Sequence, residues 1–115
     1  MLLEGVMLLD QEMMKGSIDL LLLSLISQRD LYGYEIVKIL KQLSDDKYEM
    51  SEGTLYAALK RLEKKQWLES YWKETENGRR KYYTLTNQGG FALNSKRENW
   101  EWMNALVLKS SEGLL

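Results

Sequence analysis

The sequence predicts a mainly α-helical fold that carries one small β-hairpin. Helices are favoured because the chain contains no proline, which would break them, and because apolar residues recur at helical spacing. The hairpin is indicated by Asn77-Gly78, which separates two runs rich in aromatic and β-branched residues. A chain of 115 residues fits one domain with a single core and is too short for a two-domain enzyme.

The composition excludes most common kinds of enzyme. The chain is 44% hydrophobic and 29% charged, which is typical of a folded domain, but it has no cysteine and no histidine. Disulfides, thiolate nucleophiles, imidazole bases and the usual zinc sites are therefore excluded. Glu74 and Glu76 are the paired carboxylates of interest, and we expect them to be solvated ends of a strand. We expect no enzyme, no metal and no cofactor.

The apolar segments are too short for a membrane span. The strongest of them, Ile18 to Ile26, contains Asp19 and Ser24 and falls short of the roughly 20 residues that a bilayer requires. Met1-Leu2-Leu3 is followed by Glu4 and not by a basic region, so we expect no signal peptide. The lack of cysteine fits a reducing compartment, and we expect a cytoplasmic protein.

The first two helices are expected over residues 9–27 and 31–43. The first carries a broad apolar face, and the second would begin with Asp30 as its N-cap. After a polar loop, Tyr48-Glu49-Met50 could form a very short strand. We expect Tyr32 and Tyr34, like Tyr82 and Tyr83, to pack in the core and the hairpin.

The third helix, which we expect Ser51 to cap, has two different faces. Its core face consists of four apolar residues, Leu55, Ala58, Leu59 and Leu62. Its opposite face begins with small residues and continues with cations, namely Gly53, Ala57, Lys60, Arg61 and Lys64. A face with little bulk followed by cations can approach a surface closely and reach phosphates. This pattern suits a helix that enters a groove of DNA.

The hairpin is also basic. The net charge of −1 hides a local charge of +3 between residues 51 and 85, which hold eight Lys/Arg and five Asp/Glu. We expect a type I′ turn at Asn77-Gly78, followed at once by Arg79, Arg80 and Lys81. A solvated charged surface is the alternative interpretation of these cations. Three helices followed by a basic hairpin is the order of elements in a winged helix-turn-helix.

A last helix, capped by Thr86, should run to about residue 109. One stripe of this helix contains Leu93, Trp100, Met103 and Val107, whereas Phe91 and Trp102 lie on the opposite side. The preceding elements already form a complete unit, so apolar residues on two sides of this helix predict a second protomer. We therefore expect a homodimer whose interface contains the stripe.

These residues resemble the PadR-like family of transcriptional regulators. The resemblance covers nearly the whole chain from Met14 onward, because several local strings occur in the right order. They are Met14-Lys15-Gly16-Ser17-Ile18, Tyr32-Gly33-Tyr34-Glu35-Ile36, Ser51-Glu52-Gly53-Thr54-Leu55-Tyr56, Arg61-Leu62-Glu63 and Gly78-Arg79-Arg80-Lys81-Tyr82-Tyr83-Thr84-Leu85-Thr86. Ala57 departs from the pattern, because members of the family often have proline there.

The resemblance implies a winged helix-turn-helix over residues 1–85 and a dimerisation helix over residues 86–115. It implies a repressor that binds double-stranded operator DNA, with the third helix in the major groove and the wing on the flanking backbone. The residues expected at DNA are Ser51, Gly53, Thr54, Tyr56, Ala57, Lys60, Arg61, Lys64, Arg79, Arg80 and Lys81. For Tyr56, packing against the hairpin is an equal alternative to DNA contact.

The short terminal helix resembles that of a smaller branch of the family, in which some members bind flat aromatic compounds between the protomers. This implies a planar aromatic effector near Trp100 and Met103. Plain packing of Trp100 in the dimer is an equal alternative, since large aromatic residues dominate interfaces with or without a ligand. The other function that the sequence allows is a winged helix that binds a protein and does not contact DNA.

Overall fold

The structure of the protein, a computed structural model, describes residues 9–114. In chain order its elements are α1 (Gln11–Lys15), α2 (Ile18–Gln28), β1 (Leu31–Tyr32), α3 (Gly33–Leu43), α4 (Glu52–Lys64), β2 (Leu68–Thr75), β3 (Gly78–Leu85) and α5 (Asn87–Ser110). The expectation of no signal peptide concerns residues 1–4, which lie outside the described residues. The predicted fold class, mainly helical with a small antiparallel sheet, is confirmed.

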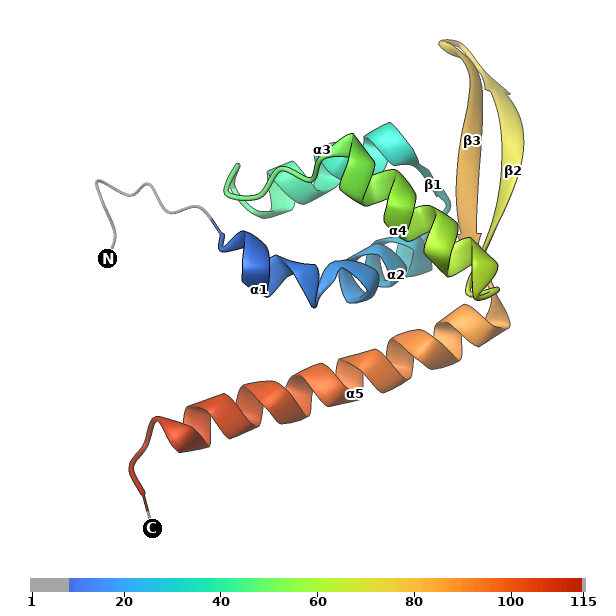
Figure 1. Cartoon of the computed structure of the whole chain (residues 1–115). Helices are drawn as coiled ribbons and strands as arrows, with labels where there is room; N and C mark the ends of the chain where they lie inside the picture. Colours follow the sequence, from blue (N-terminus) through green and yellow to red (C-terminus); the bar gives the residue numbers. More distant parts are fainter. Residues whose placement is uncertain (1–8, 115) are drawn as a thin grey trace.

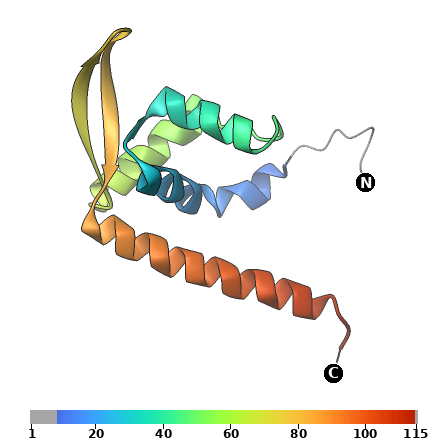
Figure 2. The ribbon, with the colours of Figure 1, turned by 180° about the vertical axis from the view of Figure 1, so that it is seen from behind.

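Helices α2, α3 and α4 pack together beside the sheet, and α5 runs back past α1 and α2 (Figure 1). The view from behind in Figure 2 shows that the hairpin of β2 and β3 projects beyond this body as a wing. Among the described residues, the core consists of Leu22, Leu23, Ile26, Leu31, Ile36, Leu40, Tyr48, Met50, Leu55, Ala58, Leu59, Leu62, Leu68, Tyr83 and Leu93. It draws on nearly every element, so the chain folds around one core.

The first predicted helix is in fact two helices. Asp10 caps α1 by accepting a hydrogen bond from the Glu12 amide, and α1 ends at Lys15 with Gly16 as its C-cap. The Ser17 amide then donates to the Met14 carbonyl, and α2 starts at Ile18. Glycine is unfavourable inside a helix, and here it marks the break. The periodicity of apolar residues in the sequence continues across this break, so the periodicity could not reveal two helices.

Asp30 does not cap α3, which was a wrong prediction. Residues Leu31 and Tyr32 instead form a short edge strand, β1, paired with Tyr83 and Tyr82 of β3. Asp30 accepts a hydrogen bond of 2.6 Å from the Tyr71 hydroxyl, so it ties β1 to the wing. The strand predicted at residues 48–50 is absent, although Tyr48 and Met50 are buried in the core.

The wing is an antiparallel hairpin, but its turn differs from the predicted type I′ turn. Thr75 pairs with Gly78, so the turn residues are Glu76 and Asn77. A type I′ turn needs a positive φ at both of its central residues. Gly78 has a φ of 101°, but Asn77 does not have a positive φ. The Thr75 hydroxyl donates to the Gly78 carbonyl and accepts from the Asn77 amide, which closes the turn.

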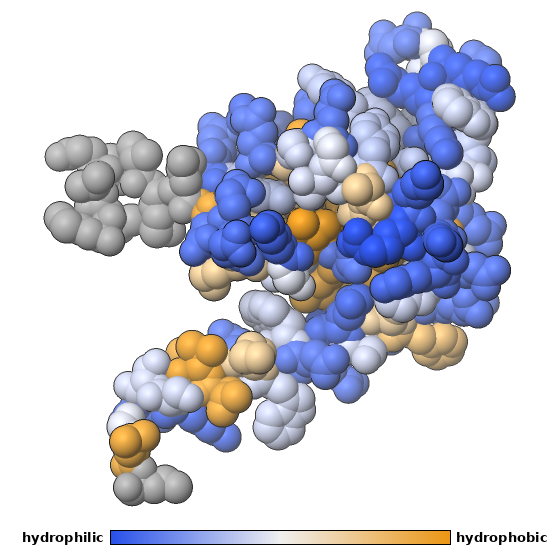
Figure 3. Space-filling view, viewed as in Figure 1, coloured by the Kyte–Doolittle hydropathy of each residue, from blue (hydrophilic) through white to orange (hydrophobic). Residues whose placement is uncertain are grey.

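Thr86 caps α5 as predicted, since its hydroxyl accepts a hydrogen bond of 2.9 Å from the Gly89 amide. The same hydroxyl donates to the carbonyl of Gln66, just after the end of α4, so the start of α5 is fixed to the winged unit. Gly89 and Leu93 are buried in the core, and farther along the helix the large apolar residues are exposed. Figure 3 shows these hydrophobic residues gathered on the distal half of α5, in contrast to the hydrophilic wing.

Candidate nucleic-acid interface

Helix α4 has the two faces that its sequence predicts. Ser51 caps it by accepting a hydrogen bond from the Thr54 amide, which satisfies a free amide in the first turn. The four apolar residues of the core face are at most 1% exposed. On the opposite face, Gly53, Ala57, Lys60 and Lys64 are exposed. The helix is therefore anchored through one side and presents small and cationic residues on the other.

Arg61 differs from the two lysines of α4. The Arg61 guanidinium donates a hydrogen bond to the carboxylate of Asp19 in α2. The Asp19 side chain is only 17% exposed, and its negative charge offsets part of the positive charge of Arg61. The sequence did not indicate this pair, because 42 residues separate the two side chains. Lys60 and Lys64 have no such partner among the described residues.

Tyr56 packs against the start of α3 and not against the hairpin alone. Gly33 makes room for it, since a Cβ atom on Gly33 would lie 2.5 Å from the Tyr56 hydroxyl oxygen. The Tyr56 side chain remains 48% exposed on the same side of the molecule as the wing cations. Tyr56 is therefore packed at one edge and accessible at the other, and its contact with DNA stays a prediction.

The three wing cations lie on two faces of the hairpin, since successive residues of a strand point to opposite sides. Arg79 lies 5.0 Å from the ring of Trp72, and Lys81 lies 4.0 Å from the Glu63 carboxylate, so both face α4. Arg80 points to the other face, where it lies 4.6 Å from the ring of Tyr32. From the sequence, only this alternation along the strand could distinguish Arg80 from the other two cations.

Two tyrosines near the interface have a raised pKa. Burial, followed by the charges of Glu63 and Tyr56, raises the pKa of Tyr83. The hydrogen bond to Asp30 raises the pKa of Tyr71.

The predicted burial of four tyrosines is met in part. Tyr83 is buried as predicted, and Tyr32 and Tyr82 are half-buried, but Tyr34 is 60% exposed and does not belong to the core. The prediction for Tyr34 was therefore wrong.

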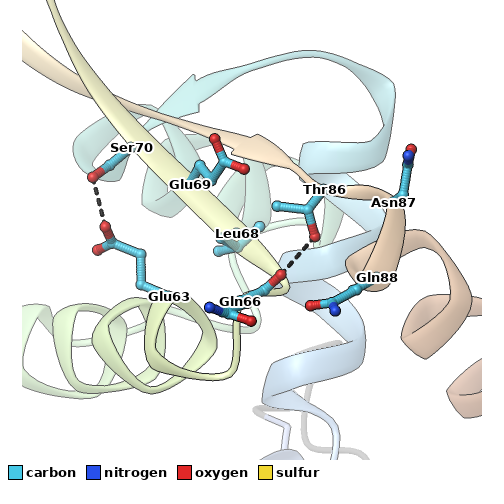
Figure 4. Close-up of a pocket in the computed structure, with 8 residues that line it drawn as sticks. All are labelled: Glu63, Gln66, Leu68, Glu69, Ser70, Thr86, Asn87 and Gln88. Atoms are coloured by element: carbon cyan, nitrogen blue, oxygen red, sulfur yellow. Dashed lines mark hydrogen bonds between the residues drawn. The ribbon is translucent and has the colours of Figure 1, made fainter.

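A polar hollow of about 610 Å³ lies where α4, the wing and α5 meet (Figure 4). Its two carboxylates are Glu63, which accepts a hydrogen bond of 2.6 Å from the Ser70 hydroxyl, and Glu69. Within residues 9–114, no group of three His, Cys, Asp or Glu side chains could hold a metal ion. Glu74 and Glu76, the carboxylates singled out in the sequence, are exposed near the tip of the wing.

The stripe on α5 divides into a core part and an exposed part. Leu93 is 4% exposed in the single chain and packs in the core, so its assignment to a dimer interface is corrected. Trp100, Met103 and Val107 are more than half exposed. An apolar hollow of about 360 Å³ on this helix is lined by Trp102, Met103 and Leu106, among others, but not by Trp100.

Comparison with known proteins identifies the family of the chain. The family model described as the transcriptional regulator PadR-like family matches residues 22–95, from α2 into α5. The chain belongs to the PadR-like family. Because members of this family are transcriptional regulators, the protein is a regulator of transcription and not an enzyme. No helix in residues 9–114 combines the length and the hydropathy that a membrane span needs.

Among its relatives in sequence, this PadR-like chain is 34% identical to the uncharacterized protein X of Lysinibacillus sphaericus, over 90% of this chain and 95% of that protein. It is 31% identical to the transcriptional regulator YqjI of Escherichia coli strain K12, over 80% of this chain. The match covers 43% of YqjI, so the chain spans less than half the length of that regulator.

Among solved structures, a transcriptional regulator from Clostridium thermocellum aligns with a TM-score of 0.80 and 37% identity, over 86% of this chain and 97% of that one. A PadR family regulator from Clostridium difficile R20291 aligns with a TM-score of 0.71 and 40% identity, over 82% and 97%. A PadR-like regulator from Bacillus cereus aligns with a TM-score of 0.79 and 30% identity, over 90% and 100%.

Proposed function

We propose that this PadR-like regulator is a repressor that binds operator DNA directly, as a homodimer. The observation that carries the proposal is the exposed face of α4, where Lys60 and Lys64 follow the small residues Gly53 and Ala57 and have no carboxylate partner among the described residues. Such a face can enter the major groove closely while its cations reach phosphates. In cells without a nucleus this role places the protein in the cytoplasm.

The wing supports the same role. Arg79, Arg80 and Lys81 lie on a hairpin that projects from the body, where a wing can reach the backbone beside the recognition helix (Figure 2). In this proposal residues 1–85 bind DNA, and residues 86–115 join two protomers. The proposed interface uses Trp100, Met103 and Val107, because these apolar side chains are exposed in the single chain and a partner would bury them.

The test is a salt titration of binding to duplex DNA. Mapping of the sites that the protein occupies in its own genome supplies the operator, whose half-sites should lie about one helical turn, roughly 34 Å, or a multiple apart. Replacing Lys60 and Lys64 by Ala should weaken binding and lower the salt slope by about one for each phosphate that the variant no longer neutralises. Lys109→Ala, on α5, is the matched control and should leave the slope unchanged.

Absence of salt-sensitive binding to any duplex would overturn the DNA-binding role. It would favour the alternative in which the winged helix recognises another protein.

We also propose that a small planar aromatic molecule binds near Trp100 and Met103 and releases the repressor from DNA. The observation that favours this effector is the exposure of both side chains, 52% and 59%, on a helix that meets the partner in the proposed dimer. Two protomers would bring two indoles together, and aromatic rings stack favourably on an indole face.

A further inference from the structure

A groove lies between the wing and the first turns of α3 and α4, with a volume of about 470 Å³. We call it the wing groove and define it by Tyr34, Tyr56, Trp72, Arg79 and Lys81. Arg80 also lines it, although the Arg80 guanidinium lies on the other face of the hairpin, over Tyr32. All of its lining residues are aromatic, cationic or glycine, and none is a carboxylate. The groove therefore carries positive charge and aromatic walls together.

Two other hollows on the described part of the chain, one at each end of α4, have the opposite character. The hollow at the end of α4 is lined by Glu63 and Glu69 and by no cation. The hollow at the start of α4 is lined by Glu49 and Glu52, again without a cation. A polyanion would be repelled by both of these sites and attracted by the wing groove.

The side chains of the wing groove are accessible and held in place. Trp72 is 56% exposed, and the Arg79 guanidinium over its ring fixes the indole at 5.0 Å. Tyr34 is 60% exposed, and Tyr56 rests on Gly33. Indole N–H and phenol O–H groups can donate hydrogen bonds to phosphate oxygens, and an indole has no acceptor. Trp72 is therefore suited to an anion that approaches along the groove.

We propose that Trp72 and Tyr34, which line the wing groove, contact the sugar-phosphate strand that passes between α4 and the wing. The inference rests on the proposed DNA-binding function. If α4 occupies the major groove and the wing reaches the flanking backbone, the strand between them must pass through the space between α4 and the wing. One strand of B-DNA carries a negative charge every 3.4 Å or so, which matches a groove lined by cations.

The experiment follows binding and contact separately, on the full chain. The probe is a dye-labelled duplex of mixed sequence and about 30 base pairs, long enough for two half-sites one turn apart, at low salt. Dye anisotropy reports affinity, and tryptophan emission reports contact with an indole. Trp72→Phe keeps a ring but removes the N–H donor. It should weaken binding about tenfold, as expected when a hydrogen bond to a charged group is removed, and should remove most of the DNA-induced change in emission.

Two matched controls locate the effect. Trp102→Phe alters an even more accessible indole on α5 (74% exposed) and should retain both the affinity and the emission change. Lys81→Ala should lower the salt slope by about one per protomer, whereas Lys109→Ala, on α5 and far from the groove, should not. Thermal unfolding checks that each variant is folded.

The outcomes separate the inference from the function on which it rests. If Trp72→Phe binds as tightly as the parent and shows the same emission change, the strand does not lie in the wing groove, although the chain still binds DNA. If the parent itself binds no duplex, the proposed function fails and this inference falls with it.

Discussion

Gly89, in the first turn of α5, lies so close to the main chain of Trp67 that a Cβ atom on it would overlap the Trp67 carbonyl oxygen. The Thr86 amide donates to that same oxygen, at 3.1 Å. Together these contacts fix the direction in which α5 leaves the wing. Because α5 carries the proposed dimer interface, this junction also sets how far apart two recognition helices stand.

Gly89→Ala should therefore destabilise the fold by about 1 to 3 kcal/mol, since main-chain atoms must move to admit the methyl group. Gly90→Ala is the matched control: nothing lies within 4 Å of its Cβ position, and alanine favours a helix over glycine by up to about 1 kcal/mol. Chemical unfolding of the two variants beside the parent decides the matter. Equal stability of the two would mean that α5 is not seated on Trp67.

Much of this architecture could be predicted, because the signals are local. Ser51 and Thr86 are helix caps whose partners lie three residues away, and the core face of α4 follows from a regular spacing. The features that were missed depend on distant segments. Strand β1 exists only because β3 offers it an edge, and Arg61 meets Asp19 across 42 residues. The burial of Leu93 likewise depends on the packing of α5 against the rest of the chain, which no periodicity describes.

The pair of Arg61 and Asp19 predicts an unusual response to a neutral substitution. Asp19→Asn should lower the free energy of unfolding by about 1 kcal/mol. Exposed ion pairs contribute less than this, but here only Arg61 is well exposed, at 46%, and Asp19 is 17% exposed. The substitution should nevertheless tighten DNA binding a few-fold, since it frees Arg61 and removes a carboxylate from beside α4. Arg61→Ala should weaken binding.

Anisotropy with the operator duplex measures both effects. Glu12→Gln is the control, because Glu12 pairs with Lys15 on the exposed surface of α1. If neither Asp19→Asn nor Arg61→Ala alters affinity, Arg61 serves only to join α4 to α2.

The proposed dimer can be tested by a truncation that spares the core. A chain that ends at Arg97 keeps Gly89 and Leu93, which are buried, but lacks Trp100 and Val107. It should fold as a monomer and bind the operator more weakly by a factor of about 10² or more, because both half-sites can no longer be engaged together. Light scattering gives the mass, and the unfolding temperature of the full chain should rise with its concentration.

Phe91→Ala is the matched control for this truncation, because Phe91 is 75% exposed on the other side of α5. It should leave the dimer intact. A truncated chain that stayed dimeric would move the interface elsewhere, with the first helix, where Met13 is 76% exposed, as the next candidate.

The proposed effector site makes a prediction about two tryptophans that lie two residues apart. Trp100 lies on the stripe proposed for the interface, whereas Trp102 lines the apolar hollow on α5. A planar cationic dye that stacks on Trp100 would gain about 0.5 to 2 kcal/mol from the attraction between cation and ring. Trp100→Ala should therefore weaken quenching of the remaining tryptophan emission by the dye, and Trp102→Ala should not.

Linkage adds a second measurement to the same experiment. If the dye favours a dimer whose recognition helices no longer fit the operator, it must lower the affinity for DNA by the factor by which DNA lowers the affinity for the dye. Trp100→Ala should abolish this mutual effect. If instead Trp102→Ala removes the quenching and Trp100→Ala leaves it intact, the dye binds in the hollow of Trp102 and Met103, and Trp100 serves only in packing.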